Sequence, residues 1–289
     1  MEIARDWKDY EILDMANGEK LEVWKNVCLI RPDPQIIWQD KTYPELWKTA
    51  HARYHRSNSG GGGWKMEKKI PQNWRVHYKE LTFNIKPMGF KHTGLFPEQA
   101  VNWDWMIQKI KQENRPIKVL NLFAYTGGAT VACLSAGASV CHVDSSKGMT
   151  DWAKENVKSS GLSDKPVRFL IDDVVKFVQR EIRRGNQYDA IIMDPPSYGR
   201  GKNGEVWQFE NQIANLVELC EKVLSDNPLF FLINSYTTGI SSKVLENILR
   251  LKLKRNKGKI TSGEVGLPMK NSDLVLPCGI FGRWEKGKK

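Results

Sequence analysis

The chain has 289 residues, of which 40% are hydrophobic and 27% are charged, proportions typical of folded globular proteins and not of disordered ones. No apolar run approaches the roughly 20 residues needed to cross a bilayer, and the charged start MEIARDWKDY lacks the apolar segment of a secretory signal. We therefore expect a cytoplasmic protein without membrane association. The five cysteines show no C-x-x-C spacing, so the sequence predicts neither a disulfide framework nor a metal site.

Basic residues are in excess, and most of the excess lies near the C-terminus. Lys and Arg outnumber Asp and Glu by 44 − 33 = 11, and residues 241–289 hold twelve of the former and four of the latter. Within them, Arg250–Lys259 (RLKLKRNKGK) has six basic residues and no acidic one. This density suits contact with the phosphates of a nucleic acid. A basic end to a solvated helix, which the helix dipole favours, would give the same pattern.

The first 85 residues predict a small β-rich domain, and residues 86–289 predict a second, α/β domain. The stretches YEILDM, LEVWKNVCLI and WRVHYKELTFNIKP have β-type composition, and the Asn-Gly pair at 17–18 is a turn signal between two of them. Pro44–Arg56 is predicted to be a helix. The glycine-rich Ser57–Gly63 (SNSGGGG) is predicted to be a loop or lid.

From residue 118 onward, apolar runs alternate with segments of helical periodicity. Strands separated by helices imply a doubly wound, mostly parallel sheet, although the sequence does not fix the strand order. A hairpin at the C-terminal end would fit the last two strands. We expect helices near 99–111, 128–136, 148–160, 174–184, 207–225 and 241–255, and strands at 118–123, 139–143, 167–171, 188–193, 229–234, about 259–265 and about 274–283.

The segment 118–128 (KVLNLFAYTGG) is an apolar run that breaks into a tight glycine turn. Such a run is typical of a buried strand, and the paired Gly127 and Gly128 let backbone N–H groups approach a ligand where the following helix begins. The pattern predicts a nucleotide-type cofactor site at the carboxyl ends of parallel strands. A nicotinamide dehydrogenase would need G-x-G-x-x-G at this place, which YTGGAT does not provide.

Acidic residues follow the next two strands. Asp144 ends the second strand, 17 residues after Gly127, where a carboxylate can accept both ribose hydroxyls. An Asp at a strand end is also a common helix cap. Asp172 and Asp173 end the third strand, where one can accept a hydrogen bond from an adenine amino group while the other caps the next helix.

The fourth strand ends in YDAIIMDPPSY, residues 188–198. Asp194 followed by Pro195 and Pro196 fixes a rigid turn whose carboxylate and carbonyls point into the crevice. Such a turn can hold a flipped base, with its amino group donating to the carboxylate and to a proline carbonyl and with Tyr198 stacking on its face. A purely structural turn is the alternative.

Several of these stretches carry a family resemblance. NLFAYTGG, HVDSSKGMTDWAKENVKSSGL, FLIDDVVKFV and MDPPSYGRG resemble motifs I to IV of class I S-adenosylmethionine-dependent methyltransferases. They are most similar to the bacterial family that includes the 23S ribosomal RNA cytosine-C5 methyltransferases, and KHTGLFPEQ resembles that family's turn before motif I. The resemblance covers roughly residues 75–285. It implies a Rossmann-like sheet, S-adenosyl-L-methionine as cofactor and ribosomal RNA as partner.

The resemblance also implies roles for individual residues. The methionine part of the cofactor would lie against the glycine turn, the ribose at the second strand end, the adenine at the third, and the methyl acceptor at the Asp-Pro-Pro turn. The expected cofactor-binding residues are Phe96, Gln99, Tyr125, Thr126, Gly127, Gly128, Asp144, Ser145, Asp172 and Asp173. The expected residues on the acceptor side are Asp194, Pro195, Pro196 and Tyr198.

One departure from the family bears on the mechanism. Members that methylate carbon 5 of cytosine use a thiolate that adds to carbon 6, from a Cys after the fifth strand. In FFLINSYTTG, Ser235 stands at that position, and Cys278 in LPCGIF is expected to be a packed core residue. Asp-Pro-Pro instead favours methylation of an exocyclic nitrogen, which needs mainly orientation of the acceptor. Carbon methylation, another acceptor such as protein, and a non-catalytic RNA-binding or assembly role are the alternatives.

Overall fold

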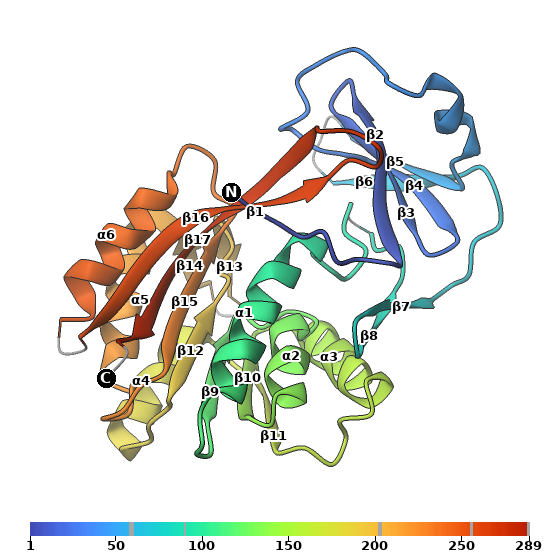
Figure 1. Cartoon of the computed structure of the whole chain (residues 1–289). Helices are drawn as coiled ribbons and strands as arrows, with labels where there is room; N and C mark the ends of the chain where they lie inside the picture. Colours follow the sequence, from blue (N-terminus) through green and yellow to red (C-terminus); the bar gives the residue numbers. More distant parts are fainter. Residues whose placement is uncertain (58–60, 90, 202–203, 255–256, 288–289) are drawn as a thin grey trace. The chain divides into compact units, whose positions relative to one another are not determined.

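The chain folds into two compact units, shown in the computed structural model of Figure 1. Unit 1 comprises Met1, Asn102–Glu264 and Gly279–Lys289, and unit 2 comprises Glu2–Val101 and Val265–Cys278. The structure describes residues 1–57, 61–89, 91–201, 204–254 and 257–287.

The two units differ in outline from the predicted domains. The sequence predicts a boundary between residues 85 and 86, whereas unit 2 continues to Val101 and also includes Val265–Cys278. Those last residues are distant in sequence from the rest of unit 2, so no local pattern connects them with it. Because compactness does not test which segments fold independently, the predicted domain boundary stays a prediction.

Unit 1 is built on a mostly parallel sheet with the strand order β16-β17-β15-β12-β9-β10-β11, and β1 (Glu2–Ile3) of unit 2 pairs with the unit 2 end of β16. Strand β9 pairs in parallel with β10 and β12, β10 with β11, and β12 with β15, whereas β17 is antiparallel to β15. The strands are β9 (Lys118–Leu122), β10 (Ser139–Asp144), β11 (Val167–Ile171), β12 (Ala190–Met193), β15 (Phe230–Ser235), β16 (Gly258–Pro268) and β17 (Val275–Lys286). The predicted doubly wound α/β fold is confirmed.

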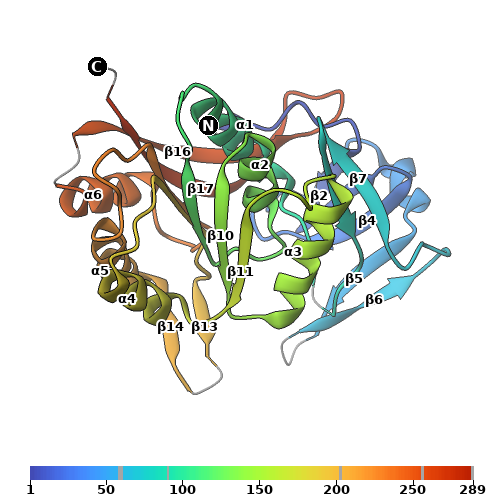
Figure 2. The same ribbon diagram turned by 90° about the horizontal axis from the view of Figure 1, so that it is seen from below.

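Helices cover both faces of this sheet. Figure 2 shows α1, α2 and α3 on one face and α4, α5 and α6 on the other. The four residues of β12 are all buried because both faces are covered, which explains the unbroken apolar run in the sequence. Among the helices of the described residues, none is long and apolar enough to span a bilayer. The helices are α1 (Ala100–Lys111), α2 (Gly128–Ser135), α3 (Lys147–Ser159), α4 (Val174–Arg184), α5 (Phe209–Glu221) and α6 (Ser242–Lys252).

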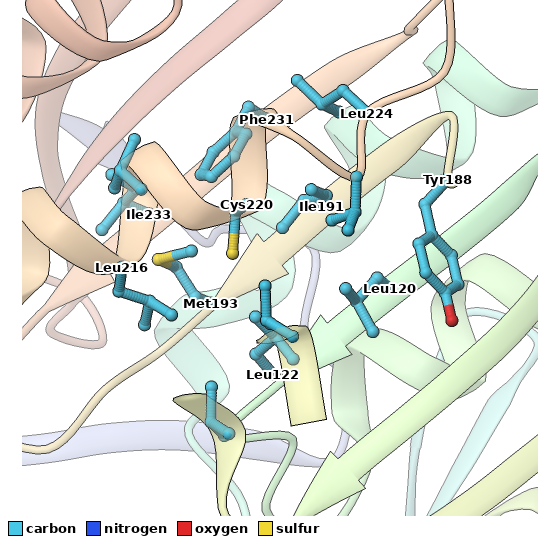
Figure 3. Packing of buried hydrophobic residues seen from close by; sticks show 14 of the residues in the cluster. Leu120, Leu122, Tyr188, Ile191, Met193, Leu216, Cys220, Leu224, Phe231 and Ile233 are labelled. Atoms are coloured by element: carbon cyan, nitrogen blue, oxygen red, sulfur yellow. The ribbon is translucent and has the colours of Figure 1, made fainter. Parts of the chain in front are cut away.

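A large hydrophobic cluster lies between the sheet and helices α4 to α6 (Figure 3). Side chains alternate between the two faces of a strand, so every second strand residue enters this cluster. Helix α5 contributes Ile213, Leu216 and Cys220, which recur at helical spacing along one face. The strand residues in the cluster include Leu120, Leu122, Ile191, Met193, Phe231 and Ile233.

Unit 2 contains a five-stranded sheet in the order β2-β3-β4-β5-β6 and a separate β7-β8 hairpin, so the predicted β-rich N-terminal region is confirmed. Asn17 and Gly18, with φ angles of 54° and 76°, form the tight turn between β2 and β3. Buried Asp14 fixes the segment that follows β4. Its carboxylate accepts from the Tyr43 N–H and from the Trp47 indole N–H. The strands are β2 (Tyr10–Ala16), β3 (Glu19–Trp24), β4 (Val27–Pro32), β5 (Ala52–Arg56), β6 (Gly62–Met66), β7 (Trp74–Tyr78) and β8 (Leu81–Ile85).

Two local predictions in this unit are wrong. The helix predicted over Pro44–Arg56 is limited to the short 3-10 helix η1 (Pro44–Thr49), and Ala52–Arg56 forms β5. Strand β5 pairs with β4 on one side and β6 on the other, and this pairing outweighs the local helix preference. Gly62, predicted to belong to a loop, begins β6, while residues 58–60 of that loop lie outside the described residues.

Candidate active site

The carboxyl ends of four neighbouring strands form the candidate site. Strands β12, β9, β10 and β11 lie side by side, and the chain leaves β9 toward β10 and later returns to β12 on its other side. Ligands of such sheets bind at this topological switch point. The Tyr125 N–H donates to the Asp144 carboxylate at 2.8 Å, and the Asp172 N–H donates to the Asp144 carbonyl at 3.0 Å. The Asp194 N–H donates to the Leu122 carbonyl at 3.4 Å, so the predicted strand-end loops meet at one edge.

The loop after β9 has a strained backbone. Phe123 and Tyr125 have φ angles of 53° and 51°, a left-handed conformation that costs a residue with a side chain about 1 kcal/mol or more. Gly127, at φ 81°, adopts the same conformation without that cost. The fully buried Asn156 of α3 holds the loop, because its side-chain amide donates to the Thr126 carbonyl at 2.8 Å. Strain maintained by such contacts is typical of ligand-binding loops.

The paired glycines are also required by packing. A Cβ on Gly127 would lie 2.9 Å from the Cβ of Ala153 in α3. A Cβ on Gly128 would lie 2.9 Å from Cζ2 of Trp103 in α1. The two helices therefore approach the loop more closely than any side chain at these positions allows. This is a second reason for the glycines beside the approach of a ligand to the backbone.

Asp144 has both carboxylate oxygens partly engaged. One oxygen accepts from the Tyr125 N–H, and the other accepts from the Ser146 N–H at 2.8 Å. Each keeps a free lone pair, so the group can still accept hydroxyl donors. Burial raises the pKa of Asp144, although these two hydrogen bonds act against the rise. Ser145 is exposed beside it, and Ser146 caps α3, so Asp144 itself is not the helix cap.

The structure distinguishes the two acids at the end of β11. Asp173 is the N-cap of α4, since its side chain accepts from the Lys176 N–H at 2.8 Å. Asp172 instead forms an ion pair with Arg180 through one oxygen. Asp173 therefore serves the capping role that the sequence assigned to one of the pair, which leaves Asp172 as the candidate acceptor for an adenine amino group.

The turn after β12 is held from two sides. Asp194 is half-buried and Pro195 is buried at the strand end. The Pro196 carbonyl accepts from the Trp207 indole N–H at 2.7 Å, so this carbonyl is already occupied. The Ser197 hydroxyl accepts from the Thr237 hydroxyl at 2.9 Å. The carbonyl of Pro195 is therefore the better candidate acceptor for an amino group.

Tyr198 begins a short hairpin of β13 (Tyr198–Arg200) and β14 (Val206–Gln208). Its ring is half exposed, and its hydroxyl accepts from the Arg200 guanidinium at 2.8 Å. An exposed ring next to the Asp-Pro-Pro turn suits stacking against an acceptor base.

The predicted residues Phe96 and Gln99 lie in unit 2, at the 3-10 helix η2 (Pro97–Gln99) that precedes α1. Gln99 is buried, and the Phe96 ring lies 5.2 Å from the ring of His92. Their contact with a cofactor stays a prediction, because the other predicted cofactor residues belong to unit 1.

A buried polar chain under the glycine turn was not predicted. The Asn121 amide donates to the Thr130 hydroxyl at 3.0 Å, and that hydroxyl lies 2.9 Å from Nδ1 of His142. Burial lowers the pKa of His142 to about 3, so its ring is neutral. Its Nε2 has no partner among the described residues. The sequence carried one signal, the polar Asn121 within an apolar strand, but its partners Thr130 and His142 are separate from it in sequence.

The cysteines give no support for a thiol nucleophile. All five are described, and none forms a disulfide. The three in unit 1 are buried, and burial raises the pKa of each, that of Cys141 to about 11. Burial also raises the pKa of Cys278, which is half-buried and whose thiol donates to the Leu276 carbonyl. Ser235 is buried at the end of β15, and its hydroxyl accepts from the Thr237 N–H at 3.2 Å. A low-pKa thiolate is what carbon methylation requires.

The basic segment Arg250–Lys259 is partly neutralised by acids. Arg250 pairs with Glu246 of α6 at 3.0 Å, and Lys252 pairs with Glu218 of α5. Residues 255–256 of this segment lie outside the described part of the chain. The first basic residues of the segment are thus explained by the alternative, a basic end to a solvated helix. Contact of the remaining basic residues with nucleic acid stays a prediction.

Comparison with known proteins agrees with this geometry. A family model described as S-adenosylmethionine-dependent methyltransferase matches residues 48–251, which is more than half of the chain. The chain therefore belongs to the S-adenosylmethionine-dependent methyltransferase family, and S-adenosyl-L-methionine is its cofactor. The family resemblance predicted from the motifs is confirmed at this level.

Three individual proteins show how far the similarity extends. The "Ribosomal RNA large subunit methyltransferase K/L" of Shewanella sp. (strain MR-4) is 34% identical over 148 residues, which are 50% of this chain and 20% of that protein. The chain thus matches only about a fifth of the length of this curated relative. The crystal structure of the SAM dependent methyltransferase from Agrobacterium tumefaciens is 34% identical with a TM-score of 0.93, covering 98% of this chain and 92% of that one. SMU.776, solved in complex with SAH, has the same fold at 18% identity, with a TM-score of 0.75 over 96% of this chain and 76% of that one.

The strand ends fit this cofactor chemically. A ribose and an adenine present hydroxyl and amino donors, and Asp144 and Asp172 offer carboxylate oxygens at adjacent strand ends. A methionine chain needs a close backbone surface, which the turn at Gly127 provides because no side chain projects there. Both features come from residues of unit 1 alone.

Proposed function

We propose that this enzyme methylates an exocyclic nitrogen of a base in RNA, with large-subunit ribosomal RNA as the substrate. The observation that carries the proposal is the Asp194-Pro195-Pro196 turn at the end of β12, next to β9 and the strained loop that follows it. The acceptor and the cofactor would then meet at the switch point of the sheet.

Each group has one task in this reaction. Asp144 accepts the ribose hydroxyls, Asp172 accepts the adenine amino group, and the turn at Gly127 contacts the methionine chain. The bound cofactor supplies an electrophilic methyl group on its sulfonium. Asp194 and the Pro195 carbonyl accept the two hydrogens of the acceptor amine, which localises its lone pair.

Orientation is the main source of rate in this proposal. Holding an amine in line with a methyl group converts a bimolecular step into an oriented one, an effect that reaches several kcal/mol. Tyr198 would fix the plane of the base by stacking. Support for nitrogen over carbon comes from the raised pKa values of the buried thiols and from Ser235 at the place of the family's Cys.

The choice of RNA is supported by the name of the matched curated relative and by the basic charge of the chain, 44 Lys and Arg against 33 Asp and Glu. Such a substrate agrees with the cytoplasmic location expected from the sequence. A non-catalytic RNA-binding or assembly protein is the second candidate, favoured by the absence of the family's nucleophile at Ser235.

Labelled-methyl transfer to ribosomal RNA, followed by mass spectrometry of its nucleosides, tests the proposal. We expect a methylated amino group in the product, and in Asp194→Ala we expect transfer to fall by about 100-fold because the acceptor is no longer oriented. Cofactor binding, measured by calorimetry, should stay within about twofold of wild type. The matched control is Asp164→Ala, an exposed carboxylate paired with Lys165.

A C5-methylated pyrimidine would contradict the nitrogen assignment. No transfer to any RNA, with intact cofactor binding, would favour the non-catalytic candidate. Unchanged nucleosides in ribosomal RNA from cells lacking the gene would indicate a non-ribosomal substrate.

A further inference from the structure

Arg180 of α4 connects this helix with the end of β11. Its side chain forms an ion pair with Asp172, in which Nη2 of the guanidinium contacts Oδ2 of the carboxylate. Side chains of a helix lean toward its N-terminus, and α4 begins at Val174, directly after the two acids that end β11. A long side chain in the middle of α4 therefore reaches back to the strand end.

Other basic side chains of α4 do not make this contact. Arg184 pairs with Glu181 of the same helix at 3.2 Å, and Lys176 pairs with Glu205. Arg183 is exposed and has no ion-pair partner in the described part of the chain. The contact with Asp172 is thus particular to Arg180, and Arg183 offers a matched control in the same helix.

The ion pair occupies only one oxygen of Asp172. Oδ2 contacts Arg180, whereas Oδ1 accepts no hydrogen bond from any of the described residues. The backbone of Asp172 is fixed as well, because its N–H donates to the Asp144 carbonyl at 3.0 Å. Since 26% of the Asp172 side chain is exposed, a ligand can reach it. The second oxygen is therefore an accessible acceptor on a carboxylate that is already held in place.

A carboxylate held in this way distinguishes purines by the group at position 6. An ionised carboxylate only accepts hydrogen bonds. The amino group of adenine donates one, whereas the carbonyl of hypoxanthine cannot donate and brings two acceptors together. A site that receives a donor rejects an analogue without it, because the polar group of the protein is left unpaired. Holding the carboxylate before binding also removes the cost of ordering it.

We propose that Arg180 is a positioning residue for the cofactor. It holds the Asp172 carboxylate through one oxygen, so that the other accepts the 6-amino group of adenine, and it thereby sets the preference of the enzyme for adenine over hypoxanthine. The inference rests on one part of the proposed function, the assignment of adenine to Asp172, and not on the identity of the methyl acceptor. A guanidinium that competes with adenine for Asp172, and an ion pair that only stabilises α4, are the alternatives.

Calorimetry on the full chain with two ligands tests the proposal. The first ligand is S-adenosyl-L-homocysteine, and the second is S-inosyl-L-homocysteine, which carries hypoxanthine in place of adenine. Wild type should bind the first roughly tenfold or more tightly than the second. In Arg180→Gln we expect the Kd of the first to rise about fivefold, because the carboxylate must then be ordered on binding. The Kd of the second should stay within about twofold, since it receives no hydrogen bond from this preordering.

Two further variants separate positioning from a general effect of charge. Arg180→Lys keeps a cation beside Asp172 and should restore part of the preference, although it lacks the planar fork of arginine. Arg183→Gln makes the same charge change at an exposed site of the same helix, and both Kd values should stay within about twofold of wild type. Urea unfolding should give similar midpoints for all variants, because ion pairs between partly exposed side chains add little stability.

Asp172→Ala shows whether Arg180 acts through this carboxylate. The preference should be lost in Asp172→Ala, and adding Arg180→Gln should then have no further effect, because no carboxylate is left to hold. Equal losses of affinity for both ligands in Arg180→Gln would overturn the proposal, as would a wild type without preference or an unchanged preference in Arg180→Gln. Tighter binding of S-adenosyl-L-homocysteine in that variant would overturn it too, because the guanidinium would then compete with adenine.

Labelled-methyl transfer by wild type separates this inference from the proposed function. If wild type methylates no RNA but Arg180→Gln loses the preference for adenine, the proposed acceptor fails and the positioning role stands. If wild type methylates an amino group of RNA and Arg180→Gln keeps the preference, the positioning role fails and the proposed methyl transfer stands.

Discussion

Trp207 contacts both the turn after β12 and the loop after β9 in the candidate active site. Its indole N–H donates to the Pro196 carbonyl at 2.7 Å, and its ring lies 5.0 Å from the ring of Phe123. Phe123 belongs to the strained loop after β9, and Pro196 belongs to the turn after β12. One side chain thus contacts both the Asp194-Pro195-Pro196 turn and the loop after β9.

Replacing this indole by a phenyl ring isolates the hydrogen bond. In Trp207→Phe the ring contact with Phe123 is largely kept, while a hydrogen bond worth about 1 kcal/mol is lost. We expect kcat for methyl transfer to fall about fivefold because the turn is less well fixed, with cofactor Kd unchanged within about twofold. The control, Tyr43→Phe, also removes one side-chain donor, here to the Asn271 carbonyl in unit 2, and should leave kcat unchanged. Equal loss of cofactor affinity in Trp207→Phe would show that the indole supports the cofactor loop instead.

At the scale of elements, the start of α2 is defined by close packing against α1. Gly128 has an ordinary φ, so an alanine there meets no backbone strain, but its Cβ would lie 2.9 Å from Trp103. Overpacking of this kind costs about 1–3 kcal/mol. We expect Gly128→Ala to lower the free energy of unfolding in urea by that amount and to weaken cofactor binding.

A second substitution tests the cause. Trp103→Phe shortens the opposing ring, so Gly128→Ala/Trp103→Phe should lose less stability than the sum of the two single changes. Strict additivity of the two free-energy changes would mean that the ring is not what the alanine meets.

The elements that the sequence predicted are those whose pattern is local. Strands β9, β12 and β15 are buried on both faces, and their apolar runs are visible in the sequence. Asp144 and Asp194 could be placed because Asp144 ends the apolar run of β10 and Asp194 directly follows that of β12. Strand β5 was missed because its conformation is set by partners on both sides, and Trp207 was missed because its contact is to a turn earlier in the chain. Choosing Asp173 over Asp172 as the cap required the side-chain partners of both.

At the scale of the whole molecule, neither unit is one continuous stretch of sequence. Strands β16 and β17 each change unit along their length, at Glu264–Val265 and at Cys278–Gly279. The part of this hairpin in unit 2 supplies a partner strand to β1, and the Lys270 N–H donates to the Ile12 carbonyl at 2.8 Å. A compact N-terminal region therefore needs residues that lie far outside the first hundred positions of the chain.

Because unit 2 includes Val265–Cys278, we predict that residues 1–101 alone do not fold cooperatively. The missing hairpin holds four buried apolar side chains, and burying each contributes about 1.5–3 kcal/mol, a sum comparable to the stability of a small domain. The four are Val265, Leu267, Met269 and Leu276. Urea unfolding followed by circular dichroism should show no sigmoidal transition for the 1–101 fragment. The same fragment joined by a flexible linker to residues 262–281 should regain one, because the hairpin can return to its place beside β1. A cooperative transition of 1–101 with the same midpoint as the linked form would show that the hairpin is dispensable, and that the N-terminal region folds as the independent domain the sequence predicts.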